Sequence, residues 1–207
     1  MHQEGTPDIS AGKVIQYKLN DGQWQNWDLS EVSLSDSDKM YVKSDDDIPT
    51  GEQDGFDEIY KCFVMTGSIA ASGNIMSLLN FSNTLPNFAF YSLFKDCRSL
   101  TQAPSLPATT LANDCYTAMF FNCTALTQAP ALPATTLADK CYNIMFGNCT
   151  ALTQAPALPA TTLARYCYNN MFGRCSKFSE CHMKVEMKGV YNTSTHGNTT
   201  KTVVYDL

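Results

Sequence analysis

The sequence lacks the short motifs that mark the common enzyme classes. It contains no phosphate-binding loop, no G-x-S-x-G nucleophile turn and no dinucleotide-binding fingerprint. Histidine is scarce, and His2, His182 and His196 all lie outside the repeated region described below. A cysteine nucleophile would therefore have no histidine base within its own repeat. These absences predict a protein that is not an enzyme and that carries no cofactor.

Patterns that bind metal ions are also missing. There is no C-x-x-C pair and no cluster of cysteine and histidine with zinc-ligand spacing. One acidic loop, residues 45–58, is a weak candidate for calcium, with Asp45, Asp46 and Asp47 as its first carboxylates. Its spacing does not match the calcium-binding loop of EF-hands, so a solvated acidic loop is the simpler interpretation.

Long apolar runs are absent. None approaches the roughly 20 residues that a helix needs to cross a bilayer, so we expect no membrane insertion. The sequence begins MHQEGTPDIS, which has neither the basic start nor the apolar stretch of a secretory signal. We therefore expect no signal peptide in this chain.

Basic residues are scarce in the first 60 residues, where most of the acidic residues lie. Residues 1–60 hold 14 acidic and 4 basic side chains, a balance of −10, whereas residues 61–207 hold 6 acidic and 10 basic, a balance of +4. The net charge of −6 argues against a nucleic-acid partner, which would require a basic stripe. The asymmetry could steer head-to-tail contact between copies of the chain, although a solvated acidic loop is the simpler explanation.

What the sequence does contain is a 26-residue unit written three times between Cys97 and Cys175. The second and third copies agree at 22 of 26 positions, and the first and second at 18 of 26. A fixed period of this length is typical of a solenoid, because no single unit can bury its own apolar face and neighbouring units must cover it.

The middle copy predicts a strand, a proline turn and a short helix. Residues 126–129 follow a variant of the leucine-rich-repeat strand pattern, and the two prolines after them remove backbone donors and end the strand. Beyond the prolines, three residues recur every four positions and would share one face of a helix: Leu137, Cys141 and Met145. Gly147 stands where the C-terminus of a helix favours a left-handed residue.

Several of these motifs resemble those of a known family. The repeats contain "LPATTLA", "CY..MF" and "C(T/S)(A/S)L", and upstream lie "SGNIMSLL" (residues 72–79) and "VIQYKLNDGQWQNW" (residues 14–27). Together they resemble the BspA-like leucine-rich-repeat proteins of Bacteroides-type gut bacteria, over roughly residues 13–178. The resemblance implies a right-handed leucine-rich-repeat solenoid that is extracellular, non-enzymatic and used for adhesion or recognition.

We therefore expect an α/β fold, a right-handed leucine-rich-repeat solenoid with a parallel sheet, short helices and a β cap at each end. The expected parts are an extended arm (1–12), an antiparallel N-terminal cap (13–73), the solenoid (74–178) and a C-terminal cap (179–207). Alternating patterns and a turn sequence place strands near residues 14–19, 23–27, 39–43, 59–66, 178–187 and 201–207.

The arm is polar and has no apolar stripe to pack, so ordering it requires contacts outside its own length. We expect it to lie against another subunit of an assembly.

The nine cysteines follow the repeat. Two sets recur at intervals of 26 and should form columns: Cys97, Cys123, Cys149 and Cys175, and Cys115, Cys141 and Cys167. Adjacent strands would bring neighbours to about 5 Å, but identical stacked positions seldom suit disulfide geometry. The odd total also argues against a complete disulfide framework. We expect reduced cysteines packed as small apolar residues.

Two surfaces are candidates for binding. Exposed polar residues should form one ladder along the copies: Thr101, Gln102, Thr127, Gln128, Thr153 and Gln154. Such a ladder suits a repeating ligand such as a glycan, or it stabilises the stack without binding anything. The third copy differs from the others at Arg165, Tyr166 and Arg174, residue types that are enriched in binding surfaces. A solvated face explains these three nearly as well.

The sequence thus predicts a recognition or attachment module for a protein or cell-surface glycan. We expect a structural subunit of a virus particle that infects Bacteroides-type bacteria, acting as a fibre, decoration or attachment protein, because the signal is missing and the arm is suited to assembly. The alternative is an adhesin on the bacterial cell surface.

Overall fold

The computed structural model describes residues 2–4, 14–28, 30–44, 51–54, 57–82, 84–177, 180–183 and 202–205. The acidic residues 45–47 lie outside these ranges, so the calcium prediction is not addressed. Among the described residues, no helix has the length and apolar character to span a membrane.

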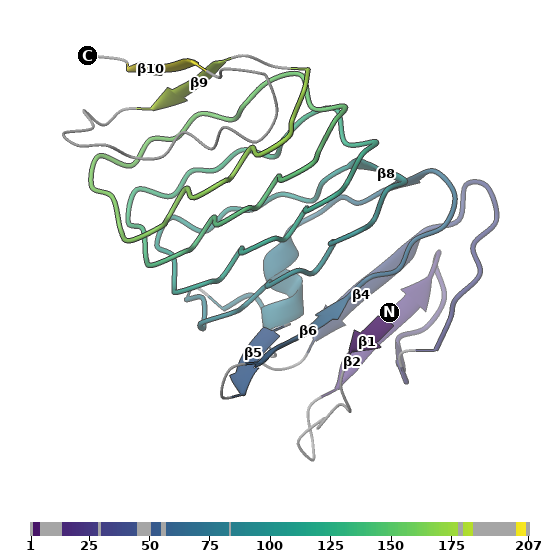
Figure 1. Ribbon diagram of the computed structural model, residues 1–207. Coiled ribbons are helices and arrows are strands. Elements are labelled where there is room, and N and C mark those ends of the chain that lie inside the picture. Colours follow the sequence, from purple (N-terminus) through teal and green to yellow (C-terminus); the bar gives the residue numbers. More distant parts are fainter. Residues whose placement is uncertain are drawn as a thin grey trace.

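The N-terminal part is built from two small antiparallel sheets. The first has the order β3-β2-β4, with β2 at Ile15–Leu19, β3 at Gln25–Asn26 and β4 at Met40–Ser44. It forms where the sequence alternates between apolar and polar residues, which is the period of a half-buried strand. Figure 1 shows these strands at one end of the molecule and the C-terminal strands at the other.

The second sheet has the order β1-β6-β5, with β1 at His2–Glu4, β5 at Gly51–Asp54 and β6 at Asp57–Cys62. The first residues of the chain therefore pair with a strand of the same chain. Residues 5–12 lie outside the described residues. Contact between the arm and another subunit stays a prediction.

Short elements join the N-terminal part to the repeats. Strand β7 at Ile69–Ala70 pairs in parallel with β8 at Leu100–Gln102. Between them, the 3₁₀ helix η1 at Ile75–Leu79 begins at Asn74, whose side chain accepts a hydrogen bond from the amide of Met76. After the repeats, β9 at Glu180–Met183 and β10 at Thr202–Tyr205 form a parallel pair.

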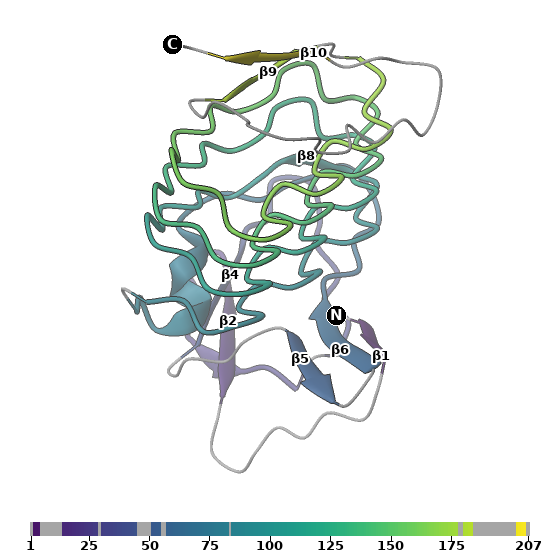
Figure 2. The same ribbon diagram turned by 60° about the vertical axis from the view of Figure 1, so that its left-hand side comes forward.

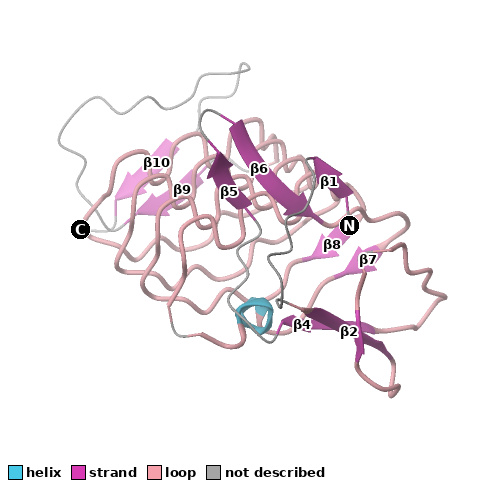
Figure 3. Cartoon of the chain, turned by 90° about the horizontal axis from the view of Figure 1, so that it is seen from below, coloured by secondary structure: helices cyan, strands magenta, loops and turns pink. Residues whose placement is uncertain are grey.

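The predicted leucine-rich-repeat solenoid of the α/β class is wrong. Within the described residues, η1 is the only helix and it precedes the repeats, and β8 is the only strand inside them. Residues 126–129 form no strand, and residues 139–145 form successive turns in place of a helix. No parallel sheet runs through the three copies, which Figures 2 and 3 show as irregular chain without helices.

The backbone hydrogen bonds explain why no helix forms. From residue 114 to residue 122, every second amide donates to a carbonyl of the next copy, as from Tyr116 to Cys141 (3.0 Å) and from Phe120 to Met145 (2.9 Å). The amides between them donate three residues back within their own copy, as from Met119 to Tyr116 (3.2 Å). In a helix all of these amides would bond within the segment. Here every second amide bonds to the next copy, and this pattern is incompatible with a helix.

The backbone dihedral angles of this segment repeat every four residues. Every fourth residue of the turn segment has a positive φ, including Asp114, Ala118 and Asn122 in the first copy and Ile144 in the second. Apolar residues four apart then share the inner face, as they would in a helix. The spacing of Leu137, Cys141 and Met145 therefore fits both structures, and only the hydrogen bonds distinguish them.

Gly147 does not have the left-handed role that its position suggested. The left-handed residue is its neighbour Asn148, with φ 61°. A Cβ atom on Gly147 would lie 2.8 Å from Cδ2 of Phe121, the residue one repeat earlier. Glycine is needed there because an aromatic side chain of the adjacent copy packs against the backbone.

Ile144 has a backbone conformation that is strained for its residue type. It is β-branched, half-buried and has φ 46°, whereas the third copy has Asn170 at the equivalent position. We expect Ile144→Asn to raise the free energy of unfolding by about 1 kcal/mol, because asparagine tolerates a left-handed conformation that costs other residues about 1–2 kcal/mol. Urea denaturation measures the change. Ile144→Val keeps the β-branch and should give no gain, and an Asn variant less stable than the Val variant would contradict the explanation.

Stacked aromatic rings run through the core and tie the N-terminal part to the repeats. The sequence of contacts is Trp27–Phe63–Phe94–Phe120–Phe146–Phe172, with ring centroids between 5.3 and 6.3 Å apart. A second ladder joins Phe90, Tyr116, Tyr142 and Tyr168 at 5.7–5.8 Å. Each ring is covered by the equivalent ring of the next copy, so burial depends on neighbouring copies being present.

Candidate functional site

The cysteine columns are part of the core. The side chains of eight cysteines, all except Cys181, are described, and all eight are buried. In the first column each thiol donates to a backbone carbonyl of the preceding turn: Cys123 to Phe94, Cys149 to Phe120 and Cys175 to Phe146, with sulfur–oxygen distances of 3.0–3.1 Å. These thiols therefore do more than fill space, because they also satisfy buried backbone acceptors.

Burial makes these thiols poor nucleophiles. It raises the pKa of Cys97 and of Cys141 to about 12, and it raises the pKa values of Cys115, Cys123 and Cys149 as well. The thiolate is the reactive form of cysteine, so a raised pKa suppresses attack on a substrate. The burial and hydrogen bonds of the cysteine columns therefore indicate a structural role in the core.

Asparagine and aspartate side chains form further ladders. The side-chain amide of Asn148 donates to Oδ1 of Asn122 (2.7 Å), and that of Asn122 donates to Oδ1 of Asp96 (2.5 Å). Another ladder links the side chain of each copy to the backbone of the next, as from the amide of Arg165 to Oδ1 of Asp139 (3.0 Å). These polar groups satisfy one another between copies, so their main role is to hold the copies in register.

The Thr–Gln face, defined as the six predicted ladder residues, is exposed to solvent in all three copies: Thr101, Gln102, Thr127, Gln128, Thr153 and Gln154. Backbone bonds fix part of its spacing, since both the amide and the hydroxyl of Thr153 donate to the carbonyl of Thr127 at 3.1 Å. The hydroxyl of Thr101 donates instead to the carbonyl of Ile69 (3.1 Å).

This face is also uncharged. The segments that carry it, residues 99–112, 125–138 and 151–164, contain no acidic or basic residue. Exposed threonines at positions 109, 110, 135, 136, 161 and 162 add more hydroxyl groups from the same segments. The described repeats therefore present hydroxyl and amide groups at regular intervals, without a competing charge.

The three variable residues of the third copy are all exposed, but the structure brings only two of them together. The guanidinium of Arg165 lies 5.0 Å from the ring centroid of Tyr166, whose side chain is 53% exposed. No contact joins Arg174 to either residue within the described part of the chain. Of the three residues that the sequence predicted as a patch, Arg165 and Tyr166 are in contact and Arg174 is not in contact with them.

A cluster of lysine and aromatic side chains on the N-terminal part was missed by the sequence analysis. Lys18 on β2 places its Nζ atom 4.8 Å from the ring centroid of Tyr41 on β4 and 5.6 Å from that of Trp24. The Nζ atom of Lys43 lies 4.9 Å from the centroid of Trp24. Trp24 is 40% exposed and Tyr41 is 42% exposed. We call these four residues the cation–aromatic cluster.

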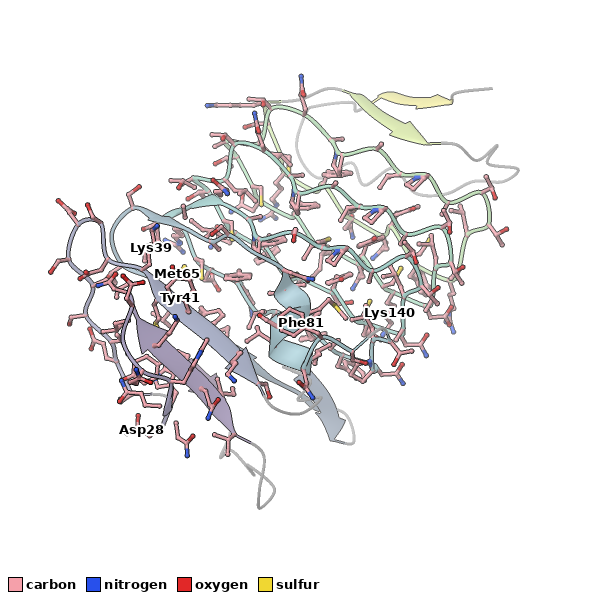
Figure 4. The ribbon with its side chains drawn as sticks, turned by 180° about the vertical axis from the view of Figure 1, so that it is seen from behind. Asp28, Lys39, Tyr41, Met65, Phe81 and Lys140 are labelled. Atoms are coloured by element: carbon pink, nitrogen blue, oxygen red, sulfur yellow. The ribbon has the colours of Figure 1, made fainter. Side chains whose placement is uncertain are left out.

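Strand register explains the cluster. Lys18 is directly opposite Tyr41 in the pairing of β2 with β4, and Gln16 is directly opposite Lys43, so Lys18, Tyr41 and Lys43 project from one face of the sheet. Trp24 precedes β3 and reaches the same lysines from its loop. Figure 4 places Tyr41 on this sheet and Lys140 among the repeats. Alternation within each strand identifies the outward residues, but the register that pairs them cannot be read from two strands 20 residues apart.

The loop that carries Trp24 is held at its base. Asn20 has φ 50°, its amide donates to the carbonyl of Lys39 (2.8 Å) and its Oδ1 atom accepts from the amide of Lys39 (2.9 Å). The side chain of Asn20 also donates to Asp38 (2.9 Å), and this bond, together with one from the backbone of Ser35, lowers the pKa of the Asp38 carboxyl. These hydrogen bonds fix the start of the loop that carries Trp24 against the residues that precede β4.

In the described part of the chain, no group of three or more histidine, cysteine, aspartate or glutamate side chains is arranged to hold a metal ion. The two candidate surfaces therefore remain the Thr–Gln face and the cation–aromatic cluster. No protein-family model, curated protein or solved structure matches this chain.

Proposed function

We propose that this protein is a non-enzymatic recognition and attachment module that binds a partner through the Thr–Gln face. The observation that supports the proposal most directly is the regular exposure of the same threonine and glutamine in each of the three copies. Hydrogen bonds between the second and third copies hold Thr127 and Thr153 in place before any ligand arrives, which lowers the entropy cost of binding.

The chemistry of the face fits a cell-surface glycan better than a charged partner. A sugar chain offers hydroxyl groups at regular intervals, and threonine hydroxyls and glutamine amides can both donate and accept hydrogen bonds. The setting could be an attachment subunit of a virus particle that infects Bacteroides-type bacteria or, as the alternative, a bacterial surface adhesin. Both settings would use the same face.

Binding of the labelled protein to intact Bacteroides-type cells tests the proposal. A cation placed at the centre of the face, Gln128→Lys, is expected to reduce cell binding at least about tenfold, because a charged side chain would have to be desolvated against an uncharged ligand. Oxidation of the cell-surface sugars with periodate should abolish binding by the unmodified protein, whereas protease treatment of the cells should not.

Tyr166→Lys is the matched control, because it adds the same charge at an exposed position where the second copy already has Lys140. It is expected to leave binding unchanged. If Tyr166→Lys abolished binding and Gln128→Lys did not, the contact surface would be the Arg165–Tyr166 pair, and the Thr–Gln face would have a structural role only. Loss of binding after protease treatment alone would point to a protein ligand.

A further inference from the structure

The cation–aromatic cluster combines two features that single residues on a surface do not provide. Two ammonium groups, those of Lys18 and Lys43, are held about the same ring, with Nζ atoms 5.6 and 4.9 Å from the centroid of Trp24. Two large aromatic side chains, Trp24 and Tyr41, remain about two-fifths exposed beside them. Tryptophan and tyrosine are enriched at binding interfaces, because each joins a large apolar ring to a polar group.

We propose that the outer face of the β2–β4 sheet is a binding site for a carboxylated sugar, such as a uronic acid within a polysaccharide. The apolar face of the sugar ring would pack on Trp24 or Tyr41, and its carboxylate would pair with the ammonium group of Lys18. The site lies on elements that do not belong to the Thr–Gln face, so it is a second site and does not depend on the function proposed for the repeats.

The surrounding residues favour this ligand over other anions. Gln16 and Asn26 lie beside the cluster and are joined by a side-chain hydrogen bond of 3.3 Å, so amide groups are available to sugar hydroxyls. A sugar that carries a carboxylate offers an anion to Lys18 and an apolar face to the aromatic rings.

Tryptophan fluorescence of the full chain reports on this site. The chain has two tryptophans, and Trp27 is 7% exposed, with its ring N–H donating to the carbonyl of Ser30 (2.9 Å). A ligand on the outer face therefore alters mainly the emission of Trp24. We expect a tetramer of galacturonic acid to change this emission in a saturable way, with calorimetry as the second measurement. The fully methyl-esterified tetramer has the same rings without the charge and should bind about tenfold more weakly.

Three variants make the test specific. Lys18→Met keeps the apolar stem and removes one charge, so it should weaken binding of the acidic tetramer about five-fold. Tyr41→Ala, checked by circular dichroism for an intact fold, should weaken binding through loss of the aromatic surface. Lys39→Met is the matched control, because Lys39 is exposed on the same sheet edge and outside the cluster, and it should change affinity less than about two-fold.

Equal affinity for the acidic and the esterified tetramer would overturn the proposal, because the lysines would then have no role. Equal loss in the Lys18→Met and Lys39→Met variants would overturn it too, since binding would reflect net charge alone. So would the absence of any saturable signal at millimolar concentrations of the acidic tetramer. Selective loss in Lys18→Met and Tyr41→Ala, with salt-dependent binding by the unmodified chain, would establish the site.

Discussion

Raising the pH from 7 to 11 is expected to unfold this protein. Burial raises the pKa values of six cysteines in the repeats, Cys167 among them. In five of the six the rise is large: Cys97, Cys115, Cys123, Cys141 and Cys149. An unfolded cysteine loses its proton near pH 8.5. The folded state keeps these protons to a higher pH. Above about pH 8.5, ionisation of the thiols therefore lowers the free energy of the unfolded state but not that of the folded state.

The sign and the size follow from this difference. A group with a raised pKa in the folded state contributes its full stability below the pKa of the unfolded state and loses it as pH rises. At pH 9 each thiol costs about 0.8 kcal/mol and at pH 10 about 2 kcal/mol, so the five together cost about 4 and about 10 kcal/mol. Domains are typically stable by about 5–15 kcal/mol. The midpoint of alkaline unfolding should therefore lie between about pH 9 and pH 11. Burial also raises the pKa values of Tyr116 and Tyr142, which act in the same direction.

Urea denaturation at a series of pH values, under a reductant, measures the effect. Cys149→Ala provides the control, because it removes one ionisable group and leaves the others in place. Its stability at pH 7 should fall through loss of packing and of the bond to Phe120, but its slope against pH above 9 should be shallower by about 1.4 kcal/mol per pH unit. A free energy of unfolding that stays constant up to pH 10 would show that the thiols are accessible to solvent.

The strands of the N-terminal part could be predicted because their side chains alternate. β2 and β4 lie within about a residue of the segments expected from alternation, and the turn after β2 contains the Asn20 that the N-D-G sequence indicated. Alternation fixes which residues point outward. It does not fix which residues of two distant strands stand opposite each other, and so the pairing of Lys18 with Tyr41 was missed.

The structure of the repeats could not be predicted from the same kind of pattern. A period of four between Cys141 and Met145 fits a helix and also fits a chain of turns in which every fourth residue is left-handed. Asn122 and Asn148 are compatible with such turns, but Ala118 and Ile144 give no sequence signal for a left-handed conformation. The cysteine columns were predicted, whereas their hydrogen bonds to the phenylalanine carbonyls depend on an offset of 29 residues that the 26-residue period does not reveal.

Replacing a fully buried ring of the phenylalanine ladder should destabilise the protein more than replacing the half-buried ring of the third copy. Phe120 is fully buried and stacks on Phe94 and on Phe146, with ring centroids 5.5 Å away on each side. Phe120→Ala removes two ring contacts and leaves a cavity between copies that the hydrogen bonds at residues 118, 120 and 122 keep from collapsing. The expected loss is about 3–5 kcal/mol of the free energy of unfolding.

Phe172 tests whether position in the ladder matters. It belongs to the third copy, is half-buried and stacks on Phe146 at 5.6 Å. Phe172→Ala removes the same atoms from a site with less apolar area to lose, so its cost should be about half that of Phe120→Ala or less. Urea denaturation at pH 7 compares the two variants under one condition. Equal losses would mean that each copy buries its own ring independently, and the ladder would then add nothing to the stability of the stacked copies.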